Sequence, residues 1–294
     1  MQSVNCALCD FNQTKKFLAG KDLIYSLPGK FQLVQCKNCG LIYINPQPDL
    51  KEINLLYPPE YTAHQKLPKE KKIGQKIKKY LGFQKATFKL VQNKGKVLDI
   101  GCGSGQFLKS LQNLGWECYG VETSLLASQR ARELGLNVST GDLLATCYPT
   151  NFFDLVVLNH TLEHLPHPNR ILEEIHRILK PKGLLQIYLP NIQGLAAQIF
   201  RRYWFNLDLP RHLYHYTPDT LKQMLQKHRF RIFKIKYVSS TSGILGSLQN
   251  WLSERKGWHK NFRKNKTLCL AVKPLVKSLD LLKLGDSFYI YALK

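Results

Sequence analysis

Short apolar runs and amphipathic segments alternate along the chain from residue 97 to its end. The runs at 97–100, 117–121 and 153–158 are rich in Val, Leu and Ile, as expected of strands buried on both faces. Residues 106–115, between the first two runs, have apolar residues at helical spacing and form a predicted helix. A second helix is predicted at 125–134, between the second and third runs. Strands and helices that alternate in this way predict a parallel sheet covered by helices on both faces.

The alternation continues to the end of the chain, with two interruptions. Further predicted elements are helices at 168–179 and 218–228, a turn at 180–183, and strands at 184–189, 231–238 and 286–293. The segment 191–217 shows no regular periodicity of apolar residues and is rich in aromatic residues and arginine, so we expect it to cap the substrate. The second interruption, 243–284, is largely helical in pattern and precedes the last strand.

The first part of the chain differs from this core. Residues 41–44 form a predicted strand, and residues 60–94 form a predicted helical connector with many lysines. The sequence therefore predicts three parts: a small N-terminal module over 1–59, the basic connector over 60–94, and an α/β domain over 95–294.

A glycine-rich turn follows the first buried run, where residues 97–106 read V-L-D-I-G-C-G-S-G-Q. Glycines let backbone N–H groups approach a ligand that a Cβ would block. A dinucleotide fold needs its third glycine three residues after the second, and here the spacing is closer. The carboxylate of Asp99 would repel a diphosphate but suits the ammonium and sulfonium groups of S-adenosylmethionine. We therefore expect this cofactor on Asp99, Gly101, Cys102, Gly103 and Gly105.

A second acid supports the same cofactor. Glu122 ends the next predicted strand about 20 residues after the glycines, where an acid accepts hydrogen bonds from both ribose hydroxyls. With these features, residues 90–240 resemble the class I methyltransferases. The resemblance implies a doubly wound, Rossmann-like, mainly parallel seven-stranded sheet, and it places Asp142 and Leu143 at the adenine. Asn159, after the fourth predicted strand, is expected to line the cofactor site.

Four of the eight cysteines form two C-x-x-C pairs separated by 26 residues, each followed by a turn residue, Asp10 or Gly40. Two pairs of thiolates fit tetrahedral zinc, and a module this small lacks the buried area to fold alone. Four thiolates leave no open coordination position, so the zinc would be structural. Reduced thiols without metal are the alternative. The predicted ligands are Cys6, Cys9, Cys36 and Cys39.

The formal net charge of +23 is unevenly distributed. Residues 60–96 carry 11 Lys and Arg against 2 Asp and Glu, and residues 181–294 carry 20 against 5. This excess of positive charge indicates an anionic partner. The alternative is a solvent-exposed basic surface that only aids solubility. The sequence shows neither a signal peptide nor an apolar stretch of about 18 residues, and its cysteine usage suits a reducing compartment. We therefore expect a cytoplasmic protein.

Histidines are the candidate catalytic groups. Methyl transfer from a sulfonium is an in-line displacement, so the protein must position the nucleophile and, where needed, remove its proton. His164 follows the fourth predicted strand and should open onto the crevice at the strand ends, where a histidine is a suitable base. The order His160-x-x-Glu163-His164 also matches inverted zinc peptidases, but Pro166 and Pro168 end the helix that such a site needs.

The predicted cap contains a second group of candidates in the sequence P-R-H-L-Y-H-Y over 210–216. The zinc module followed by this core resembles bacterial deoxysugar C-methyltransferases and ubiquinone-type O-methyltransferases. The resemblance implies active-site histidines at His164 and His212, with Tyr214 and His215 close by. Arg211 either clamps a phosphate or carboxylate of the substrate or binds loop carbonyls.

Together these features predict an S-adenosylmethionine-dependent methyltransferase that acts on oxygen or carbon of a small, anionic or glycan-type metabolite, phosphorylated or lipid-linked. An RNA methyltransferase is the alternative suggested by the charge, the zinc module and the aromatic cap, although the sequence lacks an Asn/Asp-Pro-Pro-aromatic turn after the fourth strand. A binding module with an inactive methyltransferase fold is a third possibility. Residues 268–284 have a basic amphipathic pattern that either packs in the core or lies on anionic lipid.

Overall fold

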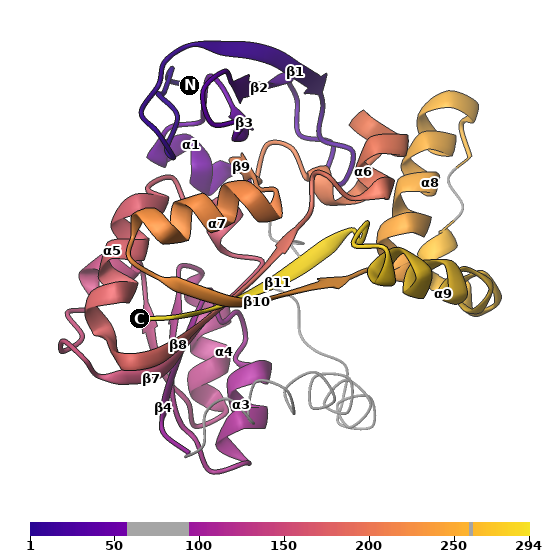
Figure 1. The fold of residues 1–294 in the computed structure, drawn as a ribbon. Helices are drawn as coiled ribbons and strands as arrows, with labels where there is room; N and C mark the ends of the chain where they lie inside the picture. The colour runs from indigo at the N-terminus through magenta and orange to yellow at the C-terminus, as the bar shows by residue number, and fades with distance from the viewer. Residues whose placement is uncertain (58–93, 259–260) are drawn as a thin grey trace.

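The computed structural model describes residues 1–57, 94–258 and 261–294, and a sheet of seven strands forms its centre (Figure 1). β11 runs antiparallel to both of its neighbours, and the other pairs are parallel. The predicted doubly wound, mainly parallel seven-stranded sheet is thus confirmed. The spatial order is β10 (Arg231–Val238), β11 (Ser287–Leu293), β8 (Leu179–Pro190), β7 (Phe153–Asn159), β4 (Lys96–Ile100), β5 (Glu117–Glu122) and β6 (Asn137–Thr140).

Helices cover both faces of this sheet because alternate side chains of its strands are apolar on both sides. In β7, Val156 and Leu158 belong to one buried cluster, and Leu155 and Val157 belong to another. The first cluster contains residues of α5 (Pro168–Ile178) and α7 (Pro218–Lys227). The second contains residues of α3 (Gln106–Gln112) and α4 (Leu125–Glu133).

The helices begin where the sequence provides capping groups. Ser124 accepts a hydrogen bond from the backbone N–H of Ala127 at the start of α4, and Thr217 and Thr220 form a capping box at the start of α7. One boundary differs from the prediction. The turn expected at 180–183 is part of β8, which begins directly after α5 ends.

A second sheet joins the N-terminal module, here residues 1–57, to a distant part of the chain. It has four antiparallel strands in the order β1 (Thr14–Gly20), β2 (Phe31–Cys36), β3 (Ile42–Ile44) and β9 (Tyr214–His215). β3 confirms the predicted strand, whereas β1, β2 and the pairing with β9 were not predicted. The short helix α1 (Leu50–Leu55) follows this sheet in the sequence. The module therefore completes its sheet with a strand of the predicted cap.

The module also shares its core with the large domain. Leu8, Leu41 and Tyr43 belong to the same buried cluster as the apolar residues of α5 and α7. Two side chains reinforce this contact: Asn169 donates to the carbonyl of Ala7 at 2.6 Å, and Lys227 donates to that of Leu8 at 3.1 Å. The basic connector predicted over 60–94 lies outside the described residues, apart from Lys94.

The segment 191–217, which we call the cap segment, contains α6 (Leu195–Phe200), two 3₁₀ helices, η5 (Arg201–Tyr203) and η6 (Phe205–Leu207), and β9. It packs against α8 (Thr241–Lys256), which together with η7 (Phe262–Lys264) and α9 (Lys266–Leu281) forms a helical hairpin on the right of Figure 1. The backbone N–H of Phe205 donates to Ser247 Oγ at 2.9 Å, which ties the two together. In the described part of the chain, none of the helices has the length and apolar character needed to cross a bilayer.

Candidate active site and metal centre

The glycine turn lies at the carboxyl end of β4, and its backbone conformation explains its composition. Gly101, Gly103 and Gly105 have φ angles of 75°, 54° and 77°, which favour glycine. A Cβ on Gly101 would lie 2.6 Å from the hydroxyl oxygen of Thr161, and one on Gly105 would clash with Leu136. Apart from its chain neighbours, no atom of the described residues lies within 4 Å of a Cβ built on Gly103, so this residue borders an open space.

Two carboxylates lie beside this open space. Asp99 is buried, and its Oδ1 has no hydrogen-bond partner among the residues that the structure describes. Burial, followed by repulsion from Glu122, raises the pKa of Asp99 well above its ordinary value. Glu122 accepts hydrogen bonds from the backbone N–H groups of Gly103 and Ser124, both at 2.8 Å. A buried carboxylate oxygen without a partner, next to an exposed backbone turn, suits a cationic ligand and disfavours a diphosphate.

The other predicted cofactor residues lie near the same edge of the sheet. Asp142 is exposed and caps the 3₁₀ helix η3 (Leu143–Ala145) by accepting from the backbone N–H of Leu144 at 3.0 Å. Leu143 is buried in the main core cluster, and Asn159 is the last residue of β7. Cys102 is buried under Gly120, where a Cβ would lie 2.7 Å from its Sγ. The nine predicted cofactor residues thus lie at or directly after the carboxyl ends of the parallel strands β4, β5, β6 and β7.

The structure brings His164 and His212 together, although they are far apart in the sequence. Their ring centroids are 4.6 Å apart in an edge-on arrangement. The Nδ1–H of His164 donates to the carbonyl of Arg211 at 3.0 Å, and that of His212 donates to the carbonyl of Asn206 at 2.9 Å. Because a carbonyl can only accept, each neutral ring keeps its lone pair at Nε2. Burial, followed by the neighbouring His164, lowers the pKa of His212 well below its ordinary value.

Glu163 completes this group, and the sequence analysis named it only within the peptidase-like motif. Its side chain is buried, with Oε1 3.2 Å from Nδ1 of His160 and 3.9 Å from Nε2 of His212, while Oε2 has no hydrogen-bond partner in the described part of the chain. The donor atoms of Glu163, His164 and His212 all lie within 4.8 Å of one another. The loop that carries Glu163 is only the short 3₁₀ helix η4 (Leu162–His164), which agrees with the expectation that no long helix forms there.

Tyr214 and His215 lie next to this group but on opposite sides of β9. Tyr214 is buried in the core cluster with Tyr43, and its hydroxyl donates to the carbonyl of Pro166 at 3.2 Å. The His215 ring centroid is 6.0 Å from that of His212, and among the described residues Nε2 of His215 has no hydrogen-bond partner. Burial, followed by the neighbouring His164, lowers the pKa of His215 to about 3, so this ring is neutral near pH 7.

Arg211 has its hydrogen bonds within the protein and is not available to clamp a substrate. Its guanidinium is fully buried, with bonds of 2.8 and 2.9 Å to the two oxygens of Asp22 and of 2.6 and 2.8 Å to Oδ1 of Asp208. The Tyr25 ring packs over it at 4.7 Å. Since its own carbonyl accepts from His164, Arg211 connects the N-terminal module to the histidine pair. Tyr57, whose hydroxyl is 3.1 Å from Nδ1 of His164, is a second link.

The four predicted metal ligands form a compact cluster at one end of the N-terminal module. The Sγ atoms of Cys6 and Cys39 are 3.4 Å apart, and those of Cys9 and Cys36 are 3.5 Å apart. Zinc bonds of about 2.3 Å in a tetrahedron require sulfur atoms about 3.8 Å apart, close to these values. The two pairs have the same local geometry: the backbone N–H groups of Asp10 and Gly40 donate to Cys6 and Cys36. Asp10 and Gly40 both have positive φ, as their turns require. The site fits structural zinc.

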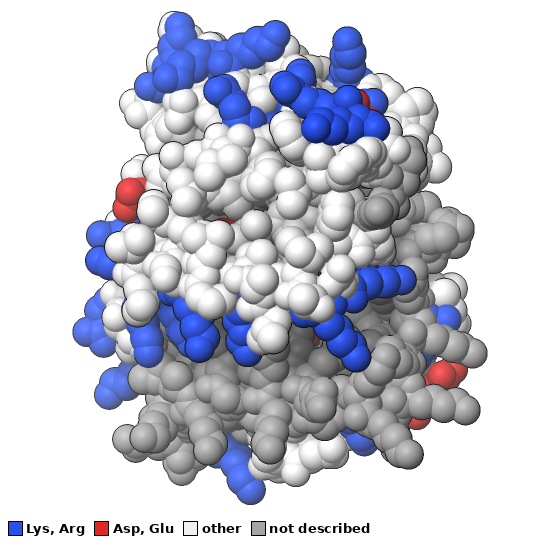
Figure 2. All heavy atoms as spheres, turned by 90° about the vertical axis from the view of Figure 1, so that its right-hand side faces the viewer, with Lys and Arg blue, Asp and Glu red and all other residues white. Residues whose placement is uncertain are grey.

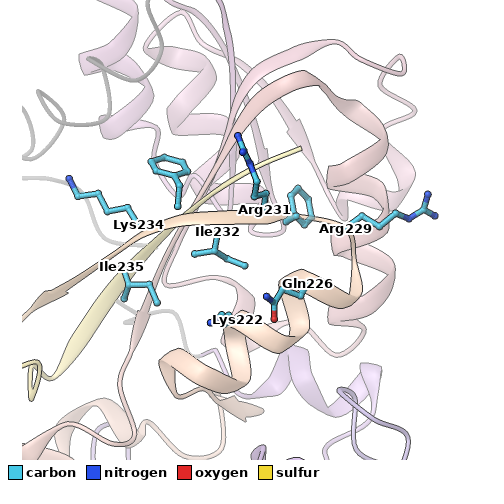
Figure 3. Close-up of a pocket in the computed structure, with 9 residues that line it drawn as sticks. Lys222, Gln226, Arg229, Arg231, Ile232, Lys234 and Ile235 are labelled. Atoms are coloured by element: carbon cyan, nitrogen blue, oxygen red, sulfur yellow. The ribbon is translucent and has the colours of Figure 1, made fainter.

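A separate groove of about 520 Å³ lies between α7 and the edge strand β10 (Figure 3). It contains none of the predicted site residues. Its lining combines four cationic side chains with apolar ones from the strand; the cationic residues are Lys222, Arg229, Arg231 and Lys234.

The strand order, the glycine turn and the paired carboxylates define a class I S-adenosylmethionine-dependent methyltransferase. The chain belongs to the methyltransferase domain family, whose model matches residues 69–235. It is also similar in fold to a SAM-dependent methyltransferase from Archaeoglobus fulgidus, with a TM-score of 0.53 and 22% identity over 74% of this chain and 94% of that one.

Two relatives whose names state a reaction type each match about a third of this chain. A ubiquinone biosynthesis O-methyltransferase of Glaesserella parasuis is 33% identical over 115 residues, 35% of this chain. A ubiquinone/menaquinone biosynthesis C-methyltransferase of Hydrogenovibrio crunogenus is 30% identical over 126 residues, 36% of this chain. The chain spans 49% of the length of each of these two relatives.

Proposed function

We propose that the protein transfers a methyl group from S-adenosylmethionine to an oxygen or carbon atom of a small, anionic or glycan-type metabolite. One observation carries this proposal. The cation-suited turn after β4 and the histidine pair beside the end of β7 lie on adjacent parallel strands at the same edge of the sheet. The relatives support either acceptor atom, because one is named as an O-methyltransferase and the other as a C-methyltransferase.

In the cofactor half of the site, the open space beside Gly103 would admit the cofactor, and the carboxylates of Asp99 and Glu122 would hold its cationic and ribose parts. Asp142, Leu143 and Asn159 would line its remaining surface. When bound, S-adenosylmethionine supplies an electrophilic methyl group whose sulfur leaves with the electron pair of the broken bond. The buried environment of Asp99 strengthens its attraction for a positive charge.

In the acceptor half, Nε2 of His164 or His212 would take the proton from the attacking oxygen or carbon. Both rings present a lone pair at this atom because backbone carbonyls hold their Nδ1–H groups. The adjacent Glu163 carboxylate stabilises the imidazolium that forms. His215, close to His212, and Tyr214, bonded to the Pro166 carbonyl, would support the pair from β9.

Calorimetric titration with S-adenosylhomocysteine tests the cofactor site. The wild-type protein should bind, and Asp99→Asn and Glu122→Ala should each weaken binding about tenfold or more, since hydrogen bonds to charged groups contribute about 1.5–3 kcal/mol. Glu117→Gln is a matched control at the opposite end of β5, where Glu117 pairs with Lys96 on the surface. Absence of binding by the wild type would favour the inactive-module alternative.

The histidine pair should be required for the transfer step and not for cofactor binding. With radiolabelled S-adenosylmethionine and a cell extract as acceptor source, His164→Ala and His212→Ala should lower methyl transfer about a hundredfold, the usual contribution of a general base. Affinity for S-adenosylhomocysteine should not change. His176→Ala on α5 is the control, since this ring packs against Phe230. Label that becomes nuclease-sensitive would instead support the RNA alternative.

A further inference from the structure

The outer face of α9 carries large apolar side chains that the rest of the protein leaves uncovered. Val276 and Leu279 are buried on the inner face of the helix. The exposed fractions of the outward leucines are high: Leu270 69%, Leu275 51%, Leu281 84% and Leu282 66%. Trp258, in the loop after α8, is 52% exposed. Several exposed leucines close together on one helix mark a contact surface more strongly than a single one does.

Lysines flank these leucines in a regular row. Lys266, Lys273 and Lys277 are separated by seven and four residues, a spacing that places them on one line along a helix. All three are exposed, and among the described residues none has a carboxylate within ion-pair distance. Figure 2 shows the side of the molecule that includes the helical hairpin: a broad, mostly uncharged area, bounded above and below by lysines and arginines.

Acidic side chains are scarce on the same hairpin, and both are engaged elsewhere. Glu254 pairs with Lys21 of the N-terminal module at 3.0 Å. Asp280 is half-buried and accepts from Ser239 Oγ at 2.7 Å. The outward face therefore combines aliphatic side chains with positive charge.

We propose that the helical hairpin binds the surface of an anionic lipid bilayer. Leucines that enter the headgroup region beside lysines that meet anionic headgroups are the usual composition of an interfacial helix, and an exposed tryptophan suits the same depth. A second copy of the chain fits less well, because it would bring like-charged lysine rows together with few carboxylates to pair them. RNA also fits less well, because exposed leucines offer no stacking surface to bases.

The position of the hairpin suggests how membrane binding would serve catalysis. This part of the inference rests on the proposed methyltransferase function. α8 is bonded to the cap segment through Ser247 and Phe205 and through Asn250, which donates to the carbonyl of Tyr203 at 3.3 Å. The same cap segment carries His212. An acceptor anchored in the bilayer by a lipid chain would thus be held next to the segment that supplies one of the two histidines.

Vesicle flotation of the full chain tests the surface without requiring catalysis. The wild type should float with vesicles of phosphatidylcholine and phosphatidylglycerol, much less with phosphatidylcholine alone, and less at high salt. The triple variant Leu270→Ser, Leu281→Ser, Leu282→Ser should lower the partition coefficient at least tenfold. Each substitution removes most of an apolar side chain, and the apolar area that can enter the bilayer becomes smaller. The triple variant Lys266→Glu, Lys273→Glu, Lys277→Glu should lower it by about fivefold or more per lysine.

Two controls make substitutions of the same kind at other places on the surface. Leu125→Ser with Leu126→Ser alters exposed leucines on α4, and Lys222→Glu, Arg229→Glu, Lys234→Glu alters the cationic groove of Figure 3. Neither should reduce flotation as the hairpin variants do. The proposal would be overturned if the controls lost as much flotation as the hairpin variants, or if flotation did not depend on phosphatidylglycerol. It would also be overturned if the wild type formed a dimer that the leucine variant dissociates, or if nuclease abolished flotation. Calorimetry with S-adenosylhomocysteine on the same preparations separates these outcomes from failure of the methyltransferase assignment.

Discussion

Removing zinc should abolish methyl transfer, even though the four cysteines belong to the N-terminal module and the glycine turn belongs to the large domain. In Cys36→Ser we expect loss of the metal and unfolding of the N-terminal module, because binding of structural zinc contributes about 10–16 kcal/mol in zinc-finger peptides. β3 would then no longer pair with β9, and the core cluster shared by Tyr43 and Tyr214 would open. His212, just before β9, would lose its fixed position, and so would Arg211.

Metal analysis, thermal unfolding and the radiolabel assay together check this expectation. The wild type should contain about one zinc ion per chain, as a single four-cysteine site requires. Cys147→Ser is the matched control, since Cys147 is an exposed cysteine outside the cluster. Full activity in a metal-free chain, or an unchanged unfolding temperature in Cys36→Ser, would contradict the assignment of these cysteines as structural ligands.

The sheet and its cofactor turn could be predicted because their signals are local. Residues 97–100 are apolar apart from Asp99, and three glycines follow within five residues, so that strand, turn and helix are all encoded in adjacent positions. The same holds for α5, where the buried face appears directly as apolar residues at helical spacing. The two cysteine pairs could also be recognised as a metal site from the sequence, because each pair and its turn residue lie within five positions.

The coupling between the two sheets could not be predicted, because it depends on residues far apart in the sequence. β9 has only two residues, too short for a period to appear, and its partner Tyr43 is more than 150 positions away. The buried pair of Arg211 and Asp22 likewise joins positions separated by 189 residues. Arg211 therefore has the same local sequence whether it binds a substrate or a carboxylate of its own chain.

Glu163 shows a different limit. Its identity was visible in the sequence, but an acid beside a histidine in a loop is ordinary on a protein surface. Only the structure shows that the loop folds inward, that the side chain is buried, and that the backbone N–H of Leu213 donates to its carbonyl at 2.8 Å. The cap segment thus buries this carboxylate and supplies the histidine that it faces.

The buried guanidinium of Arg211 should be the most sensitive ionic group in the described part of the chain. Arg211→Met leaves the fully buried Asp22 carboxylate without its cationic partner, and we expect a loss of about 3–5 kcal/mol in the free energy of unfolding. Asp22→Asn should cost less, because Asp208 still neutralises the guanidinium. Lys21→Met is the matched control: it breaks the exposed pair with Glu254 one residue away and should cost less than about 1 kcal/mol.

The pH dependence of this loss should identify the ion pair as its cause. Burial acts to raise the pKa of Asp22, but hydrogen bonds from Arg211 and from the backbone of Ile24 and Tyr25 outweigh it and hold the pKa below its ordinary value. A carboxyl group with a lowered pKa in the folded state contributes its full stability above the unfolded pKa of about 3.9 and loses it as the pH falls further. Denaturant unfolding should therefore show the difference between wild type and Asp22→Asn constant near neutral pH and shrinking below about pH 4. A difference that did not change with pH would mean that Asp22 acts through its hydrogen bonds and shape, with no contribution from its charge.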